Sequence, residues 1–174
     1  MPVTYINIAS TTLSTTTSSV TFSSIPQTFT DLVLYISGKS ATSNDSYLKT
    51  LYDNNTSAIY SYTRLYGDGS SVVSNRNSGQ TSETAPNAIN QSNLANSTNT
   101  FSNSTFYIPN YTSTTSKPYL LDLAQEANNA TGVVRTVQAS LFRNTSAITS
   151  LTMSGFFGGL AAGTSLYLYG IKNS

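Results

Sequence analysis

The segment D-L-V-L-Y-I-S, from Asp31 to Ser37, decides the fold class. Leucine, valine, tyrosine and isoleucine fill both its odd and its even positions, so an extended chain here is apolar on both faces. A short run of this kind predicts a central β-strand that is covered on each side. Threonine, tyrosine, valine and isoleucine, which favour pleated sheets, are common in the rest of the chain, so this strand has candidate partners.

Short β-favouring runs recur on either side of this segment, with turn signals between them. The clearest is 133–142, where Val137, Ala139 and Leu141 alternate with Thr136, Gln138 and Ser140. The other expected strands are Val3–Ala9, Val20–Ile25, Tyr47–Tyr52, Ile59–Tyr66, Val72–Val73, Phe101–Ile108, Tyr119–Ala124, Ile148–Met153 and Thr164–Ile171. About ten short strands predict an all-β protein, an antiparallel β-sandwich that is jelly-roll-like.

The 174 residues fit one domain, 1–174. Between Asn75 and Asn99 there are no β-favouring runs, and serine, asparagine, glutamine and glycine dominate the sequence. We expect a long ordered loop near 75–100. A loop of that length in a compact domain is uncommon unless it has a function, and covering a neighbouring subunit is one.

Charge and composition argue against several partners and compartments. The net charge is +1 and the eight basic residues are scattered, which gives no electrostatic reason to bind nucleic acid or an anionic membrane. Cysteine is absent, which suits assembly in a reducing cytosol, and the start lacks the features of a signal peptide. The most apolar stretch, S-G-F-F-G-G-L-A-A-G from Ser154, is too short to span a bilayer and is typical of a loop between strands.

The residues that usually carry catalysis are scarce. Histidine is absent, and with it the commonest general base and metal ligand. No G-x-S-x-G motif accompanies the many serines. Two carboxylates could meet in space to hydrolyse a glycan, so that alternative stays open as the third hypothesis. The acids are Asp31, Asp45, Asp53, Asp68, Glu83, Asp122 and Glu126. We expect a protein that is not an enzyme, with no catalytic, cofactor-binding or metal residues.

The chain has 12 tyrosines, nearly all on expected strands. We expect more than half of them to be core aromatics, because a buried tyrosine needs only one partner for its hydroxyl. The remainder would form a surface suited to binding proteins or sugars, since tyrosine brings contact area at a low entropy cost. The interface candidates are Tyr60, Tyr62, Tyr66, Tyr111, Tyr167 and Tyr169.

Four segments carry a resemblance to known proteins. S-S-V-T-F-S-S-I-P-Q-T-F-T-D-L-V-L from Ser18 to Leu34 is similar to the opening of a family of small β-rich structural proteins in tailed bacteriophages, many from cyanophages and other aquatic phages. F-Y-I-P-N-Y-T from Phe106, T-S-A-I-T-S-L-T-M from Thr145 and A-G-T-S-L-Y-L-Y-G-I-K from Ala162 show the same likeness. The resemblance implies a virion component with a β-sandwich that assembles as a homotrimer. It implies no catalytic residues.

Two functions follow from this resemblance. The first is a capsid decoration (cement) protein on the surface of the virion, assembled in the host cytoplasm, whose partners are the major capsid protein and copies of itself. The alternative is a tail-fibre or receptor-binding module that recognises host surface glycans. A free-standing domain that begins to fold at its first residues, without a shaft or anchoring segment, favours decoration.

Overall fold

The computed structural model describes residues 4–42, 47–90, 100–126 and 134–172. Within these ranges the chain forms twelve strands and no helix, so no helix there could cross a membrane. The strands are β1 (Thr4–Thr12), β2 (Ser19–Phe22), β3 (Asp31–Gly38), β4 (Leu48–Tyr52), β5 (Tyr60–Gly67), β6 (Val72–Gln80), β7 (Glu83–Ala85), β8 (Ser102–Ile108), β9 (Lys117–Gln125), β10 (Val134–Phe142), β11 (Leu151–Gly155) and β12 (Ser165–Lys172).

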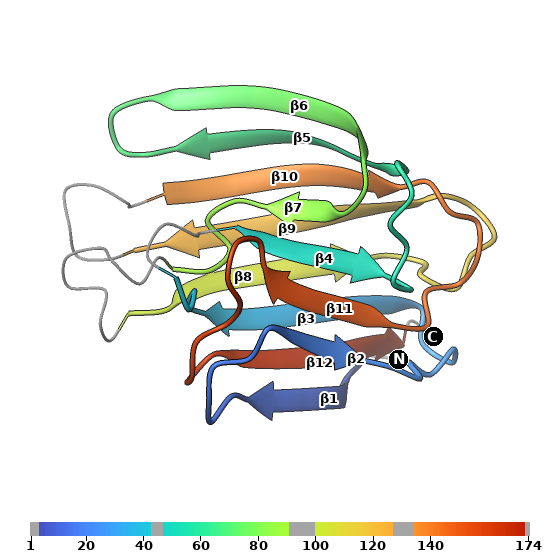
Figure 1. Ribbon diagram of the computed structural model, residues 1–174. Helices are drawn as coiled ribbons and strands as arrows, with labels where there is room; N and C mark the ends of the chain where they lie inside the picture. Colours follow the sequence, from blue (N-terminus) through green and yellow to red (C-terminus); the bar gives the residue numbers. More distant parts are fainter. Residues whose placement is uncertain (1–3, 43–46, 91–99, 127–133, 173–174) are drawn as a thin grey trace.

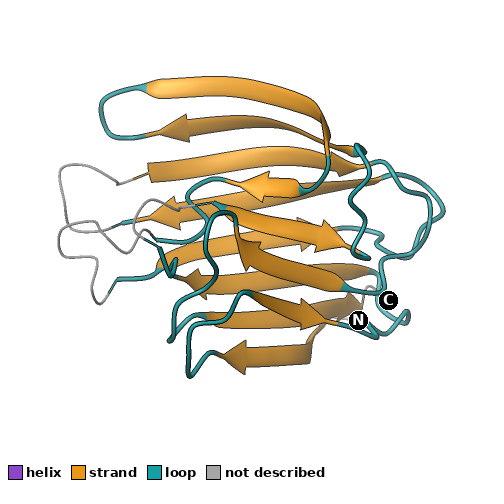
Figure 2. Ribbon diagram, viewed as in Figure 1, coloured by secondary structure: helices purple, strands orange, loops and turns teal. Residues whose placement is uncertain are grey.

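These strands form two packed antiparallel sheets, which confirms the predicted all-β sandwich (Figure 1). The large sheet has the order β1-β12-β3-β8-β9-β10-β5-β6, and the small sheet has the order β2-β11-β4-β7. Loops join the strands throughout, and the chain crosses repeatedly between the two sheets, in the manner of a jelly roll (Figure 2). The small sheet covers only part of the large one, so β5 and β6 extend beyond β7 (Figure 1).

β3 lies inside the large sheet between β12 and β8, as a central strand should. Leu32, Leu34 and Ile36 point into the core and are at most 1% exposed. On the other face Val33 is buried between its register partners on β12 and β8, whereas Tyr35 is 37% exposed. The expectation that β3 is covered on each side is therefore wrong, because the small sheet covers one face and only neighbouring side chains shield part of the other.

The expected long loop near 75–100 is also wrong in its first part. β6 continues to Gln80 as the edge strand beside β5, and β7 follows at Glu83–Ala85 as the edge of the small sheet. The sequence of β6 lacks an apolar alternation because most of its side chains are exposed, so its pairing rests on the backbone. Residues 91–99, the last part of that expected loop, lie outside the described residues.

The core between the sheets contains an aromatic cluster of Tyr52, Tyr60, Tyr119 and Phe142. Their ring centroids lie 4.9–6.0 Å apart in stacked, tilted and edge-on arrangements. Such pairs stabilise a core beyond the area they bury. The segment between β11 and β12 is a loop, as its glycines predicted, and most other strand ends lie within three residues of those expected.

Candidate functional site

The large sheet has one face that the small sheet does not cover, and we call it the open face. Tyrosines from four adjacent strands gather on one half of it. Tyr35 on β3 lies opposite Tyr167 on β12 in register. The Tyr169 ring contacts the rings of Tyr5 and Tyr35 edge-on, with centroid-to-centroid distances of 6.4 Å and 5.9 Å. With Tyr107 on β8, these residues form what we call the tyrosine patch: Tyr5, Tyr35, Tyr107, Tyr167 and Tyr169.

Asp31 anchors one member of the tyrosine patch, Tyr107. Tyr107 donates its hydroxyl to Asp31 Oδ2 at 2.8 Å, and the backbone N–H of Asn110 donates to Asp31 Oδ1 at 2.9 Å. Burial, and then the hydrogen bond to Asp31, raises the pKa of Tyr107, while burial raises the pKa of Tyr35. Both hydroxyls therefore stay neutral at physiological pH and act as hydrogen-bonding groups, not as charges.

The other half of the open face is apolar at its centre. Leu65 on β5, Leu120 on β9 and Val137 on β10 are 47–57% exposed, although each lies in the middle of a strand. Together with Ala139 they line a shallow hollow of about 440 Å³, which we call the apolar trough. An exposed apolar cluster on a flat sheet is typical of a surface that binds another molecule.

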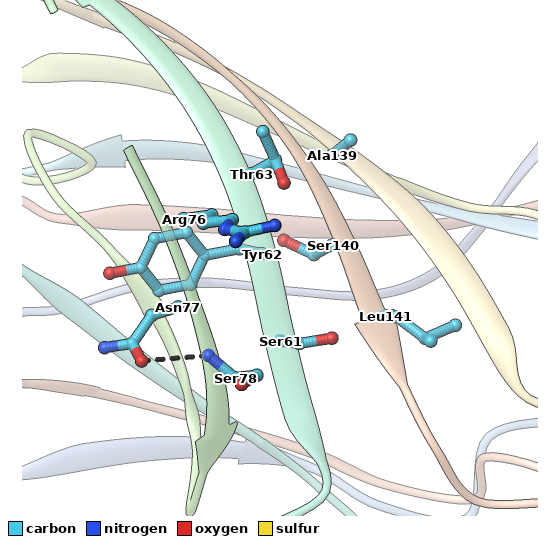
Figure 3. Close-up of a pocket in the computed structure, with 9 residues that line it drawn as sticks. All are labelled: Ser61, Tyr62, Thr63, Arg76, Asn77, Ser78, Ala139, Ser140 and Leu141. Atoms are coloured by element: carbon cyan, nitrogen blue, oxygen red, sulfur yellow. Dashed lines mark hydrogen bonds between the residues drawn. The ribbon is translucent and has the colours of Figure 1, made fainter. Parts of the chain in front are cut away.

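Two further hollows adjoin the apolar trough on the same face. One, of about 680 Å³, is lined by polar and small side chains that include Ser61, Thr63 and Arg76 (Figure 3). In this view Tyr62 and Asn77 lie on the opposite side of β5 from Ser61 and Leu141. The other, of about 200 Å³, contains the exposed ion pair between Arg135 and Asp122. The open face is therefore uneven, with few charges and several places for a partner's side chains.

β10 explains why the open face is apolar, since its burial pattern is inverted. Thr136, Gln138 and Ser140 point toward the inside of the sandwich and are at most 6% exposed, whereas Val137 faces solvent and is 47% exposed. A half-buried strand normally places its apolar side inward. The alternation predicted from the sequence is present, but the side that contacts solvent is the apolar one.

The six interface candidates do not form one surface. Tyr167 and Tyr169 lie in the tyrosine patch, and Tyr62 and Tyr66 lie half-buried on the other face of the sheet, at β5. Tyr60 is wrong as a surface candidate. It begins β5 beneath the small sheet, is 1% exposed, and donates its hydroxyl to the Asn55 carbonyl at 3.0 Å.

Tyr111 is wrong for the same reason. It is fully buried in the connection after β8, where its hydroxyl donates to the Pro26 carbonyl and its own carbonyl accepts from the N–H of Ile148 at 3.0 Å. Only four tyrosines are buried core residues, Tyr52, Tyr60, Tyr111 and Tyr119, so the expectation that more than half would be is wrong. The cause is the uncovered open face. The interface candidates did not include Tyr5, Tyr35 and Tyr107, because these tyrosines can be assigned to the open face only once the strand register is known.

Among the acidic residues that the structure describes, Glu83 is the most deeply buried. Its pKa is also the most strongly shifted, because burial raises it to about 8. Hydrogen bonds from Tyr119, Ser140 and Gln138 lower this pKa but do not outweigh the effect of burial. Glu83 is 1% exposed, and both of its carboxyl oxygens already accept hydrogen bonds, one from Tyr119 and one from Gln138. In the described ranges no three metal-ligating side chains lie close enough to hold an ion, and Asp45 lies outside those ranges.

No protein-family model matches this chain, and no curated protein matches it. Among solved structures, galectin LEC-6 from Caenorhabditis elegans is 15% identical, with 94% of this chain and 96% of that chain covered and a TM-score of 0.36. The CBM2 module of the evolved Dit protein from Lactobacillus casei BL23 phage J-1 is 11% identical, with 95% and 76% covered and a TM-score of 0.27. A protein of unknown function from Shewanella oneidensis MR-1 is 11% identical, with 99% and 77% covered and a TM-score of 0.26. Similarities at this level carry no information on function.

Proposed function

We propose that this protein is a structural component of a phage particle, a non-catalytic decoration protein that binds the capsid through its open face. Its partners are the major capsid protein and further copies of itself, assembled as a trimer. The single observation that carries the proposal is the composition of the open face, where five tyrosines and the apolar trough replace the charged residues usual on a solvated surface. Aromatic enrichment with few charges is characteristic of the centre of protein interfaces.

The size of the open face supports the same proposal. Eight strands spaced ~4.8 Å apart span about 34 Å, and strands of this length at ~3.3 Å per residue are about 25 Å long. Their product is roughly 850 Å², close to the ~800 Å² that each partner buries in a standard stable interface. One docking event could therefore cover the face without a change in the fold.

The position of the phage-like segments fits this proposal as well. They lie on β2 and β3, at the end of β8, at the start of β11 and on β12. β12 and β8 flank β3 in the large sheet, and β2 pairs with β11 in the small one, so segments far apart in sequence form one contiguous block. This block carries most of the tyrosine patch, which links the resemblance to the surface proposed to bind.

Copy number and particle stability test the proposal. On a decorated capsid we expect hundreds of copies per particle, and we expect particles without the protein to assemble but to lose DNA or break at lower temperature. Equally robust particles that fail to adsorb to cells would replace decoration with the receptor-binding alternative. A few copies, or a few dozen, would place the protein on the tail or on fibres at a vertex.

A further inference from the structure

A second surface lies on the opposite side of the large sheet, where β5 and β6 extend beyond the small sheet (Figure 1). Tyr62, Arg64 and Tyr66 alternate along β5 on this side and are only partly buried. The Arg64 guanidinium lies 4.8 Å from the centre of the Tyr62 ring and 6.0 Å from that of Tyr66. Two aromatic rings thus flank one cation in a cation–π arrangement.

Polar residues of the adjacent strands lie beside these three side chains, and two of them, Thr136 and Gln138 on β10, are at most 2% exposed. In register, Asn75 on β6 and Gln138 on β10 lie on either side of Arg64, and Thr136 on β10 lies beside Tyr66. We call the whole set the inner shelf: Tyr62, Arg64, Tyr66, Asn75, Thr136 and Gln138. Its members come from three neighbouring strands of one sheet, so a rigid scaffold sets their spacing.

The inner shelf contains polar atoms that lack hydrogen-bond partners. Four buried side-chain atoms here have none: Arg64 Nε, Asn75 Oδ1, Thr136 Oγ1 and Gln138 Oε1. Three of the four fall in a single row across β6, β5 and β10. Buried polar groups are nearly always paired, because leaving one unpaired is unfavourable, so four in one place call for a partner that the chain itself does not supply.

The chemistry of these atoms indicates which partner fits. Arg64 Nε can only donate, the Asn75 and Gln138 oxygens can only accept, and the Thr136 hydroxyl can do either. A phosphate or carboxylate offers acceptors alone and would leave the amide oxygens unpaired. Hydroxyl groups both donate and accept, and the rings of Tyr62 and Tyr66 add flat apolar contact area on either side.

We propose that the inner shelf binds a saccharide, with its hydroxyls paired to this polar row and its apolar ring faces packed on Tyr62 and Tyr66. Rotation of the two tyrosine side chains opens the row to the ligand, and rotamer changes of this kind are common on binding. This site does not depend on the proposed decoration role, because it lies on the opposite face of the sheet from the docking surface. A particle-bound copy would present it to solvent.

Calorimetric titration with neutral oligosaccharides of glucose, galactose, mannose and N-acetylglucosamine, chosen from a glycan array, tests the proposal. We expect wild-type protein to bind at least one, and Tyr62→Ala, Tyr66→Ala and Asn75→Ala each to weaken it at least ten-fold. Thr136→Val keeps the shape of the side chain and removes only the unpaired hydroxyl, so it should weaken binding without lowering stability. Tyr35→Ala and Tyr167→Ala on the open face are matched controls that should bind normally.

Three results would overturn the saccharide site. The first is that wild-type protein binds no glycan on the array, which would assign the polar row to bound water only. The second is that the shelf variants bind as wild type does, and the third is that the two open-face controls lose binding instead. Each result leaves the decoration role to its own test on particles, so the two proposals fail separately.

Discussion

Tyr119 on β9 donates its hydroxyl to the buried carboxyl of Glu83 on β7, and this hydrogen bond joins the two sheets at the edge of the small one. The other Glu83 oxygen accepts from Gln138 Nε2 on β10. The positive charge of Arg64 on β5 lowers the pKa of this carboxyl, and Glu83 in turn contributes to raising the pKa of Tyr52 on β4. Glu83 therefore lies where five strands meet, at 1% exposure.

The buried Glu83 makes stability depend on pH. Its pKa is about 8 in the folded protein and 4.5 in a solvated chain, so between these values the folded state holds a proton that the unfolded state releases. The free energy of unfolding should therefore fall as pH rises from about 5 to about 8, by up to ~5 kcal/mol at 1.36 kcal/mol per pKa unit. Urea denaturation across this range measures the slope.

Glu83→Gln is the matched control for this slope. The amide keeps the size of the side chain and an oxygen for Gln138 but cannot ionise, so the variant should lose most of the decline between pH 5 and 8. Asp68 does not contribute to the slope between pH 5 and 8, because hydrogen bonds from Ser70 and Ser71 hold its pKa well below the usual range. An equal slope in both proteins would show that another group is responsible.

Tyr60→Phe tests the assignment of this tyrosine to the core. The hydroxyl accepts from the backbone N–H of Tyr52 at 3.1 Å and donates to the Asn55 carbonyl at 3.0 Å, so its removal leaves two backbone groups without a partner. We expect a loss of about 1–3 kcal/mol in the free energy of unfolding. Tyr62→Phe, two residues along the strand and half-buried, should change it by less than ~0.5 kcal/mol. Equal effects would contradict the assignment.

The sandwich was predictable because the strands carry strong local signals. The burial of individual faces was not, and residues 133–142 show why. Their alternation predicts a strand, but period two is the same whether Val137 or Gln138 points inward, and only the extent of the small sheet decides. For the same reason, the sequence did not predict that Tyr35 and Tyr107 lie on the open face. It also predicted Tyr60 to be at a surface, whereas the small sheet covers it.

Edge strands were the second feature of the fold that the sequence did not predict. Residues 75–80 read as a loop because no apolar face repeats there, yet their backbone pairs with β5. Glu83 was unremarkable among seven acids, since its burial depends on β7 packing over β9 and β10, an arrangement with no local signature. The inner shelf is likewise a product of register across three strands, so the sequence could suggest Tyr62 and Tyr66 but not the polar row between them.

Gly155→Ala should destabilise the loop after β11. A Cβ at this position would lie 2.5 Å from the carbonyl oxygen and 2.7 Å from the nitrogen of Gly159, and backbone atoms cannot easily move away. We expect a loss of about 1–3 kcal/mol, typical of overpacking. Gly67→Ala is the control, since its nearest neighbour would be 3.6 Å away, so thermal denaturation should show little change or a slight gain. A similar loss of stability in both variants would mean that the backbone moves to relieve the close approach between residues 155 and 159.

Leu120→Lys tests the open face as the docking surface. Leu120 is 57% exposed at the centre of β9, so a lysine there should change the free energy of unfolding by less than ~0.5 kcal/mol while it places a charge in the apolar trough. Burying that charge against a partner is unfavourable, and we expect the amount of protein bound to particles lacking it to fall at least ten-fold in a sedimentation assay. Phe157→Lys, at a residue 70% exposed in the β11–β12 loop, makes the same change outside the open face and should bind normally. If both variants bind as wild type does, the trough lies outside the interface, and if only Phe157→Lys fails, that loop and not the sheet contacts the particle.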